Sequence, residues 1–309
     1  MLYVTTRDEL TTYTSERALE ERRASDGGFY VPYRLPKLSL EELQDLRKMD
    51  PGDCIRFIVR RFLRISESAF DLGSVPVRCI PCGNRIVICE TFPEGIGSFS
   101  GYMNEIAKVM RLRSCERSPW LDISFRVGAL AAALMEYPRS YLGPDEERVD
   151  IAVVSGDLFG AVSIYLAREM GLPVGDILCC CNENSGFWEL LHHGEIRTDK
   201  IAVCTGFLEA DVAVPDGLEC LLALCCGRDE VDRYLRSLRV GRPYRPGEEA
   251  SERLRSMFRA TVVTAPGRMC GAYITHGIPV KPATALALAG LLNLRATKGA
   301  YRPALVISE

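Results

Sequence analysis

Residues 149–181 read VDIAVVSGDLFGAVSIYLAREMGLPVGDILCCC, and this stretch decides the fold class. Apolar β-formers fill Ile151–Val154, as in a buried strand, and Ser155-Gly156 starts a turn. The spacing over Ala161–Met170 predicts a helix, which the following glycine and proline end before a second apolar strand. Strand, glycine loop, helix and strand in this order predict an α/β protein with a largely parallel sheet and helices on both faces.

The loop at Ser155-Gly156 has a chemical use as well as a structural one. Such a loop presents backbone N–H groups and a helix N-terminus to an anion, although by itself this signal is generic. Asp157 complicates that reading, because a carboxylate about 4 Å from a phosphate is repelled by about 4 kcal/mol at an effective dielectric constant of about 20. The alternative is that Asp157 caps the helix, as Asp readily does.

Bulk properties exclude several classes of protein. With 309 residues, 47% hydrophobic and 26% charged, the chain is long enough for one large or two medium globular units. The net charge is −3, which lacks the basic excess of nucleic-acid-binding proteins. We interpret Arg56, Arg60, Arg61 and Arg64 as one solvated helix face, so no nucleic-acid partner is predicted.

The N-terminus, MLYVTTRDEL, contains acidic residues and no apolar stretch, so no export or transit signal is visible and a cytoplasmic protein is expected. The most apolar runs, Val127–Met135 and Ala283–Leu294, are shorter than the roughly 20 residues that span a bilayer. They have the composition of buried helices. No membrane segment is predicted.

The thirteen cysteines are expected to be reduced and used as small buried apolar residues. Cys79 and Cys82 form a C-x-x-C, which would be half of a zinc site if Cys225 and Cys226, or His192 and His193, came close. Adjacent ligands suit tetrahedral coordination poorly, and the C-x-x-C lacks the context of a redox motif. No metal is therefore predicted.

Several other elements follow from local patterns. Ser39 followed by acidic residues predicts a helix over Leu40–Leu46, which we expect Pro51-Gly52 to end, and Ile55–Ile65 continues as a second helix. Two strands, Val75–Cys79 and Arg85–Glu90, flank a turn. Later in the chain, two exposed amphipathic helices are predicted over Arg228–Leu238 and Glu248–Ala260.

Glu90–Tyr102 reads ETFPEGIGSFSGY and resembles the cofactor-lysine motif of threonine synthases, roughly E-L-F-H-G-P-T-L-A-F-K-D. Ser100 stands where that motif has its lysine, and Pro93 stands at the histidine. A lysine amine forms the imine with pyridoxal phosphate (PLP), whereas a serine hydroxyl cannot. The resemblance therefore implies that the expected chemistry is lost at Ser100.

The resemblance continues on both sides of this motif. The first forty residues, with Asp26-Gly27-Gly28 as a turn before an aromatic strand, resemble the start of a threonine synthase, and Pro119–Arg126 resembles its N-S-I-N-W-A-R helix. Between Arg113 and Pro119 there is no room for the family's mobile small domain. The resemblance implies a PLP fold of type II, tryptophan synthase β-like, with the small domain deleted near 113–119. We expect an N-terminal-like region over 1–85 and a reduced large domain over 86–309.

The resemblance also implies site residues. The loop after the first strand resembles S-G-N-F-G, although it is one residue longer; Lys281-Pro282-Ala283-Thr284-Ala285 resembles D-P-H-T-A, and the last strand resembles the family's final strand. Catalytic positions are Ser100, expected to be inactive, and Lys281 as an alternative amine. The positions implied for cofactor binding are Ser155, Gly156, Asp157, Phe159, Gly160, Thr284 and Ser308.

We expect a threonine synthase-like protein that is catalytically degenerate and does not form the PLP imine, so no cofactor is expected. One alternative is an active PLP-dependent lyase that uses Lys281, in which case PLP is the cofactor. Another is a protein that binds a phosphorylated small molecule at the loop, or a protein partner at a cleft face that the missing domain leaves uncovered.

Overall fold

The structure is a computed structural model that describes residues 1–63, 77–91, 99–112, 118–142, 147–205, 207–264, 281–298 and 302–308. Its N-terminal sheet forms around buried aromatic residues. The side chains of residues 91, 99–103, 105, 139, 298 and 308 are not described. Three strands, β1 (Leu2–Thr5), β2 (Tyr13–Thr14) and β3 (Tyr30–Pro32), pair antiparallel in the order β2-β1-β3.

The predicted Asp26-Gly27-Gly28 turn is confirmed. Gly27 has a φ of +78°, and the Asp26 carboxylate accepts a hydrogen bond from the Gly28 N–H at 2.8 Å. The turn delivers β3 beside Trp120, whose indole N–H donates to the Tyr30 carbonyl oxygen. The ring of Tyr3 packs edge-on against Trp120 at 5.4 Å, so the sheet is held by aromatic packing.

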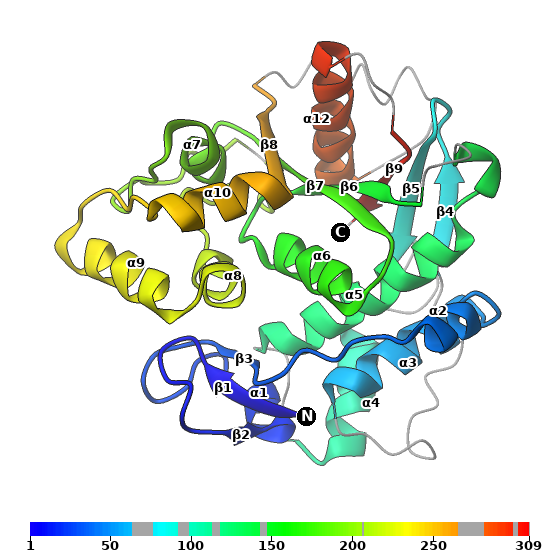
Figure 1. Cartoon of the computed structure of the whole chain (residues 1–309), viewed down its shortest axis with the longest axis horizontal. Helices are drawn as coiled ribbons and strands as arrows, with labels where there is room; N and C mark the ends of the chain where they lie inside the picture. The colour runs from blue at the N-terminus through cyan, green and yellow to red at the C-terminus, as the bar shows by residue number, and fades with distance from the viewer. Residues whose placement is uncertain are drawn as a thin grey trace. The chain divides into compact units, whose positions relative to one another are not determined.

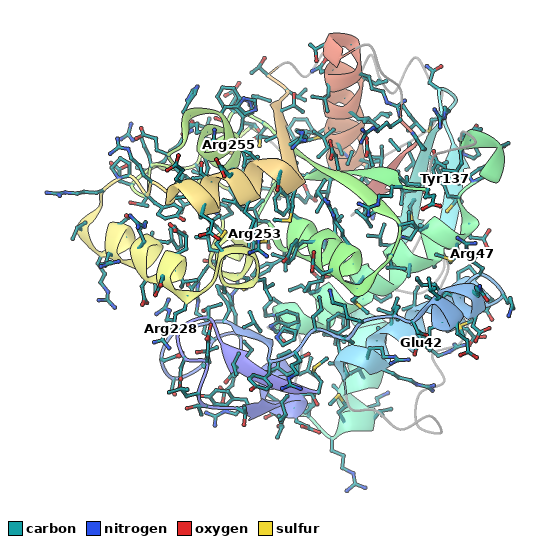
Figure 2. All side chains as sticks on the ribbon, viewed as in Figure 1. Glu42, Arg47, Tyr137, Arg228, Arg253 and Arg255 are labelled. Carbon is teal, nitrogen blue, oxygen red and sulfur yellow. The ribbon has the colours of Figure 1, made fainter. Side chains whose placement is uncertain are left out.

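The helices that accompany this sheet are α1 (Ser15–Glu20), α2 (Leu40–Leu46), α3 (Pro51–Phe62), α4 (Phe99–Met110) and α5 (Pro119–Glu136), followed by the 3-10 turn η2 (Arg139–Tyr141). Ser39 caps α2 as predicted, and with Glu42 it forms a capping box. Figure 2 labels Glu42, which also pairs with Arg61. The expectation that Pro51-Gly52 ends a helix is wrong. Pro51 instead begins α3 behind the Asp50 cap, because proline suits the first helical position.

Helices α3 and α5 pack closely because Gly128 lies at their contact. A Cβ at residue 128 would lie 2.9 Å from the Ile55 Cα atom, too close for any other residue. Most of α5 is buried, including the apolar run predicted over Val127–Met135. Its all-round apolar surface therefore reflects burial inside the protein.

The second sheet confirms the predicted fold class. It has the order β4-β5-β9-β6-β7-β8, formed by β4 (Val77–Pro81), β5 (Ile86–Thr91), β6 (Val149–Val154), β7 (Val174–Cys181), β8 (Phe258–Val262) and β9 (Ala304–Ser308). Strand β6 is parallel to both β7 and β9, and β7 is parallel to β8. Figure 1 shows β6, β7 and β8 side by side.

Two helices agree with patterns in the sequence, namely the glycine loop after β6 and the apolar run Ala283–Leu294. Helix α6 (Phe159–Met170) connects β6 to β7, as predicted, and α12 (Pro282–Lys298) packs on β6, β7 and β9 (Figure 1). Cys180 faces α12, and its thiol lies 3.4 Å from the Ala287 carbonyl oxygen. Gly290 allows this approach, since a Cβ there would collide with the Cys180 sulfur.

The remaining helices are α7 (Gly186–His193), α8 (Gly217–Cys226), α9 (Arg228–Val240) and α10 (Glu248–Met257). Figure 2 labels Arg228 at the start of α9, and Arg253 and Arg255 on α10. The prediction that the last of these helices reaches Ala260 is wrong. The chain turns extended at Phe258 and becomes β8, where Phe258 is buried and contacts the Phe187 ring at 5.9 Å. Burial on the sheet overrides the local helical pattern.

The chain divides into two compact units. The first comprises residues 1–79, 89–139 and 163–173, and the second comprises residues 80–88, 140–162 and 174–309. The deletion expected near 113–119 stays a prediction, because residues 113–117 lie outside the described part of the chain. Among the helices that are described, none has the length and apolarity needed to cross a membrane.

Candidate functional site

The candidate site is the edge of the second sheet at which its parallel strands end. The loop Ser155–Leu158 follows β6 there, and Asn182–Ser185 follows β7. Ligands of open α/β sheets bind outside the carboxyl ends of the strands, because the loops at that edge converge and helix N-termini point toward it.

The loop after β6 is held in one conformation by its neighbours. The Ser155 N–H donates to the Cys180 carbonyl oxygen at 2.9 Å, and the Leu158 N–H donates to the Ser155 carbonyl oxygen at 2.7 Å. Gly156 has a φ of +40°, and a Cβ there would collide with the carbonyl oxygen of Glu209. Leu158 also has a positive φ, +67°, and its side chain is fully buried. Backbone hydrogen bonds, one close contact and the buried Leu158 side chain thus hold the loop in this conformation.

A second close contact supports the loop from α8. The Gly217 N–H donates to the Asp157 carbonyl oxygen at 2.8 Å. A Cβ at residue 217 would lie 2.5 Å from that same oxygen, so only glycine fits. The start of α8 and the loop after β6 therefore form one packed unit.

Asp157 occupies the N-terminus of α6 with its own negative charge. Its Oδ1 atom accepts a hydrogen bond from the Phe159 N–H at 3.0 Å, while the carboxylate stays exposed. This bond reaches the first N–H group of α6, which agrees with the helix-end role that the sequence offered as the alternative to cofactor binding. The N–H groups of Ser155, Leu158 and Phe159 all donate within the chain. These three donors are therefore used within the chain, and the Asp157 carboxylate at the helix end would repel a cofactor phosphate.

Asn182, Asn184, Thr205 and Asp211 form a polar network beside this loop. The Asn182 side-chain amide donates to Asp211 Oδ1 at 2.7 Å and to Thr205 Oγ1 at 2.9 Å. Asn184 donates to the same carboxylate at 3.2 Å, and Thr205 donates to both of its oxygens, at 2.6 Å from its hydroxyl and at 2.9 Å from its backbone. The two asparagines are buried, so the network joins the end of β7 to the chain around residues 203–211.

Asn182, Asn184 and Asp211 belong to no local pattern that marks them as one group in the sequence. The sequence did not predict that their side chains meet, because more than twenty residues of chain separate the asparagines from Asp211. Since the amides of both asparagines are occupied within the network, we assign these residues a structural role at the edge.

One amine lies at this edge in an ion pair. Lys200 Nζ lies 2.7 Å from Glu189 Oε1, which also accepts a hydrogen bond from the Ser185 hydroxyl at 3.0 Å. Burial acts to raise the pKa of Glu189, but the hydrogen bonds from Lys200 and Ser185 outweigh it and lower that pKa. Glu189 thereby holds Lys200 in an ion pair.

The Ser155 hydroxyl forms a hydrogen bond with the Cys181 sulfur. Burial raises the pKa of Cys181 to about 11, so this thiol stays protonated near neutral pH. Ser155 is therefore used inside the chain at both its backbone N–H and its side chain.

The structure places Lys281 and Thr284 at the start of α12. Their neighbours Ala283 and Ala285 share an apolar cluster with Val154 at the end of β6, so α12 begins at the same edge as the loop. Lys281 is exposed, and its carbonyl oxygen accepts the Ala285 N–H at 3.0 Å. Among the residues described, no hydrogen bond or ion pair joins the Lys281 amine to the loop.

The other predicted site residues fall into two groups. Thr284, Phe159 and Gly160 are buried, the last two in the first turn of α6. Ser100 lies in the first turn of α4 and Ser308 ends β9, but both side chains lie outside the described part of the structure. The structure thus brings together the loop residues and the start of α12, and leaves the role of Ser100 as a prediction.

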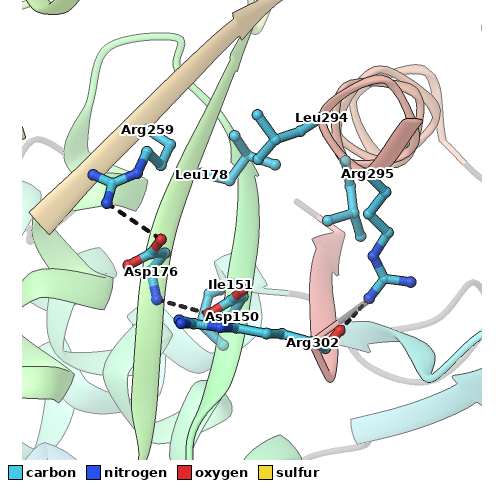
Figure 3. Close-up of a pocket in the computed structure, with 9 residues that line it drawn as sticks. Asp150, Ile151, Asp176, Leu178, Arg259, Leu294, Arg295 and Arg302 are labelled. Carbon is cyan, nitrogen blue, oxygen red and sulfur yellow. Dashed lines mark hydrogen bonds and ion pairs between the residues drawn. The ribbon is translucent and has the colours of Figure 1, made fainter. Parts of the chain in front are cut away.

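A cavity of about 380 Å³ lies at the opposite, amino-terminal edge of the same sheet (Figure 3). Its charged lining residues are Asp150, Asp176, Arg259, Arg295 and Arg302. Arg259 pairs with Asp176 at 3.5 Å, and the Asp176 N–H donates to the Asp150 carboxylate at 2.8 Å. Arg295 donates to the carbonyl oxygens of Asn84, at 2.6 Å, and Arg302. These contacts join strand ends to one another, so we regard this cavity as part of the framework.

Within the described ranges, no group of three or more His, Cys, Asp and Glu side chains has the arrangement of a metal site. Cys79 and Cys82, the C-x-x-C of the sequence, do not point toward a common centre. Cys82 points toward the apolar cluster under α12, and Cys79 has Cys89 as its hydrogen-bonding neighbour.

Comparisons with known proteins agree with this architecture. Residues 2–74 match the family model described as Threonine synthase N terminus. The whole chain is similar to the PLP-bound threonine synthase from Brucella melitensis, with a TM-score of 0.79 and 17% identity, covering 100% of this chain and 88% of that chain. No curated protein matches the chain.

Two further solved structures give the same result. The threonine synthase from yeast has a TM-score of 0.77 at 16% identity, covering 99% of this chain and 86% of that chain. The threonine synthase from Escherichia coli has a TM-score of 0.68 at 15% identity, covering 100% of this chain and 88% of that chain. At these identities the likeness shows the fold, which is the predicted type II PLP fold.

Proposed function

We propose that this chain is a threonine synthase-like protein that is catalytically degenerate and does not form an imine with PLP. The observation that carries the proposal is the Asp157 carboxylate at the N-terminus of α6, bonded to the Phe159 N–H at 3.0 Å. It occupies the helix end at which the resemblance expects the cofactor phosphate. Ser100 supports the same proposal, because a serine has no amine to condense with the cofactor aldehyde.

Two independent losses make recovery of the ordinary chemistry difficult. Loss of the amine removes the covalent anchor and the nucleophile, while the charge of Asp157 weakens any phosphate contact at the loop. Because the groups lie on different elements, one substitution does not restore both. We therefore derive no catalytic step that passes through PLP in this protein.

The test uses the purified 309-residue chain. PLP is added in excess, the visible absorbance of an imine is recorded, and the sample is reduced with borohydride before peptide mass spectrometry. No imine absorbance and no trapped lysine are expected. A trapped cofactor on any lysine would overturn the proposal.

A second candidate function rests on the exposed amine of Lys281, which lies at the start of α12 on the loop's side of the sheet. An enzyme that used this amine would show the trapped cofactor on Lys281, and Lys281→Ala would abolish the label. Lys200→Ala is the matched control, since Lys200 is held by Glu189 and its removal would leave the label in place.

A binding function without covalent chemistry is the remaining possibility, and the same preparation tests it. Inorganic phosphate and PLP are each added while the melting temperature is measured, because a ligand that binds only the folded chain raises that temperature. A rise with phosphate and no trapped lysine would favour a binding protein over both enzymatic candidates.

A further inference from the structure

Cys79 of β4 and Cys89 of β5 lie opposite each other in a hairpin. The hairpin register is set by the Cys82 N–H, which donates to the Ile86 carbonyl oxygen at 2.8 Å. Counting outward from that pair places Arg78 opposite Glu90, and these two side chains form an ion pair at 3.2 Å. The same count places Cys79 opposite Cys89.

This pair occupies the type of position at which two strands come closest. Hydrogen-bonded and non-hydrogen-bonded pairs alternate along an antiparallel ladder, so the Cys82–Ile86 bond makes Cys79 and Cys89 a non-hydrogen-bonded pair. The Cα atoms of such a pair are about 4.5 Å apart. Disulfides join residues whose Cα atoms are about 4.4 to 6.8 Å apart, so the hairpin can accept this bond.

The two thiols differ in their surroundings. Cys79 is partly exposed on β4, the edge strand of the sheet, whereas Cys89 is 2% exposed. The hydrogen bond from Cys89 lowers the pKa of Cys79, against opposing effects of burial and of Glu136. The same bond, burial and the charge of Glu90 raise the pKa of Cys89. Cys79 is therefore the accessible nucleophile and Cys89 the inner thiol that it faces.

Cys82 is excluded as the partner of Cys79 by the alternation of side chains along a strand. Its thiol packs with Ile86 and Ile88 in the cluster under α12, and lies 3.5 Å from the Ile80 carbonyl oxygen. The C-x-x-C read from the sequence thus does not mark the reacting pair.

We propose that Cys79 and Cys89 are a modification site that a low-molecular-weight disulfide, such as glutathione disulfide, converts into a cross-strand disulfide. The Cys79 thiolate attacks one sulfur of the oxidant, which releases one thiolate and leaves a mixed disulfide on Cys79. Cys89 then loses its proton and attacks the Cys79 sulfur, which releases the second thiolate. Two protein thiols are oxidised to one disulfide, and the oxidant is reduced to two thiols.

Trypsin separates the possible products without any variant. It cleaves after Arg78, Arg85 and Lys108, so Cys79 and Cys82 share the peptide 79–85 while Cys89 lies in the peptide 86–108. The folded 309-residue chain is treated with glutathione disulfide. Its free thiols are alkylated in denaturant, and the digest is analysed by mass spectrometry. A 79–85 peptide joined to 86–108 is expected, and both free peptides return after reduction.

Two variants identify the linked sulfurs. Cys82→Ser is the matched control and keeps the joined peptide, whereas Cys79→Ser loses it. The proposal is overturned if 79–85 instead carries an internal disulfide, if the joined peptides come from two different chains on a non-reducing gel, or if both peptides stay fully alkylated after oxidation. The site is independent of the proposed function, because these measurements require no cofactor.

Discussion

The carboxylate of Asp157 accepts the backbone N–H of Phe159 at 3.0 Å, so the loop after β6 provides the anion for its own helix. An internal carboxylate at this place favours α6 and disfavours an external anion, because both would use the same helix end. One residue thus contributes to stability and to the proposed loss of cofactor binding.

Asp157→Asn separates these two roles. Asparagine keeps the acceptor oxygen without the charge, so the free energy of unfolding should stay nearly unchanged, whereas Asp157→Ala should lose about 0.5 to 2 kcal/mol. Urea unfolding measures this difference. Added inorganic phosphate should raise the melting temperature of Asp157→Asn more than that of the unsubstituted chain. An equal response in the two proteins would mean that the charge of Asp157 does not oppose anions at the loop.

Asp211 should be among the more sensitive polar residues at this edge. Its carboxylate accepts hydrogen bonds from Asn182, Asn184 and Thr205, so Asp211→Ala leaves buried donors without their acceptor. We expect a loss of about 2 to 3 kcal/mol in the free energy of unfolding. Asp199→Ala removes an exposed carboxylate and should have no measurable effect. Equal effects of the two substitutions would contradict the structural role of the network.

The Lys200–Glu189 pair predicts a pH dependence. The pKa of Glu189 is lower in the folded chain than in the unfolded chain, so its contribution to stability is present above the unfolded pKa. That contribution is lost as the pH falls through the folded pKa, in the acid range. Glu189→Gln should therefore reduce the acid-induced loss of stability measured by urea unfolding at a series of pH values. Glu183→Gln, at an exposed residue nearby, should leave the profile unchanged.

Gly217→Ala tests the packing between α8 and the loop. The added methyl group would meet the Asp157 carbonyl oxygen at 2.5 Å, and backbone on both sides limits relaxation. We expect a loss of about 1 to 3 kcal/mol in the free energy of unfolding. Gly247→Ala is a milder control, because the nearest atom is a glutamate side-chain oxygen at 3.3 Å. A Gly217→Ala protein as stable as the Gly247→Ala protein would show that the loop can move away from α8.

Local sequence patterns predicted the helices, strands and turns correctly where residues close together in the sequence determine the structure. The apolar runs of β6 and β7, the Ser39 N-cap and the Asp26-Gly27-Gly28 turn all depend on residues close together in the sequence. The errors occurred at Pro51 and at Phe258. Pro51 is compatible with either end of a short helical segment, and Phe258 becomes a strand only because a neighbouring strand is present to bury it.

The amino-acid sequence by itself determined the α/β class, the glycine loop after β6 and the absence of a lysine at residue 100, because periodicity and residue identity are local properties. Only the tertiary structure decided which side chains meet. Asn182 bonds to Asp211 because the chain after α7 folds back to the end of β7. Cys79 faces Cys89 rather than Cys82 because the register of β4 and β5 places these two residues opposite each other. Register depends on pairing across the sheet, which no single stretch of the sequence specifies.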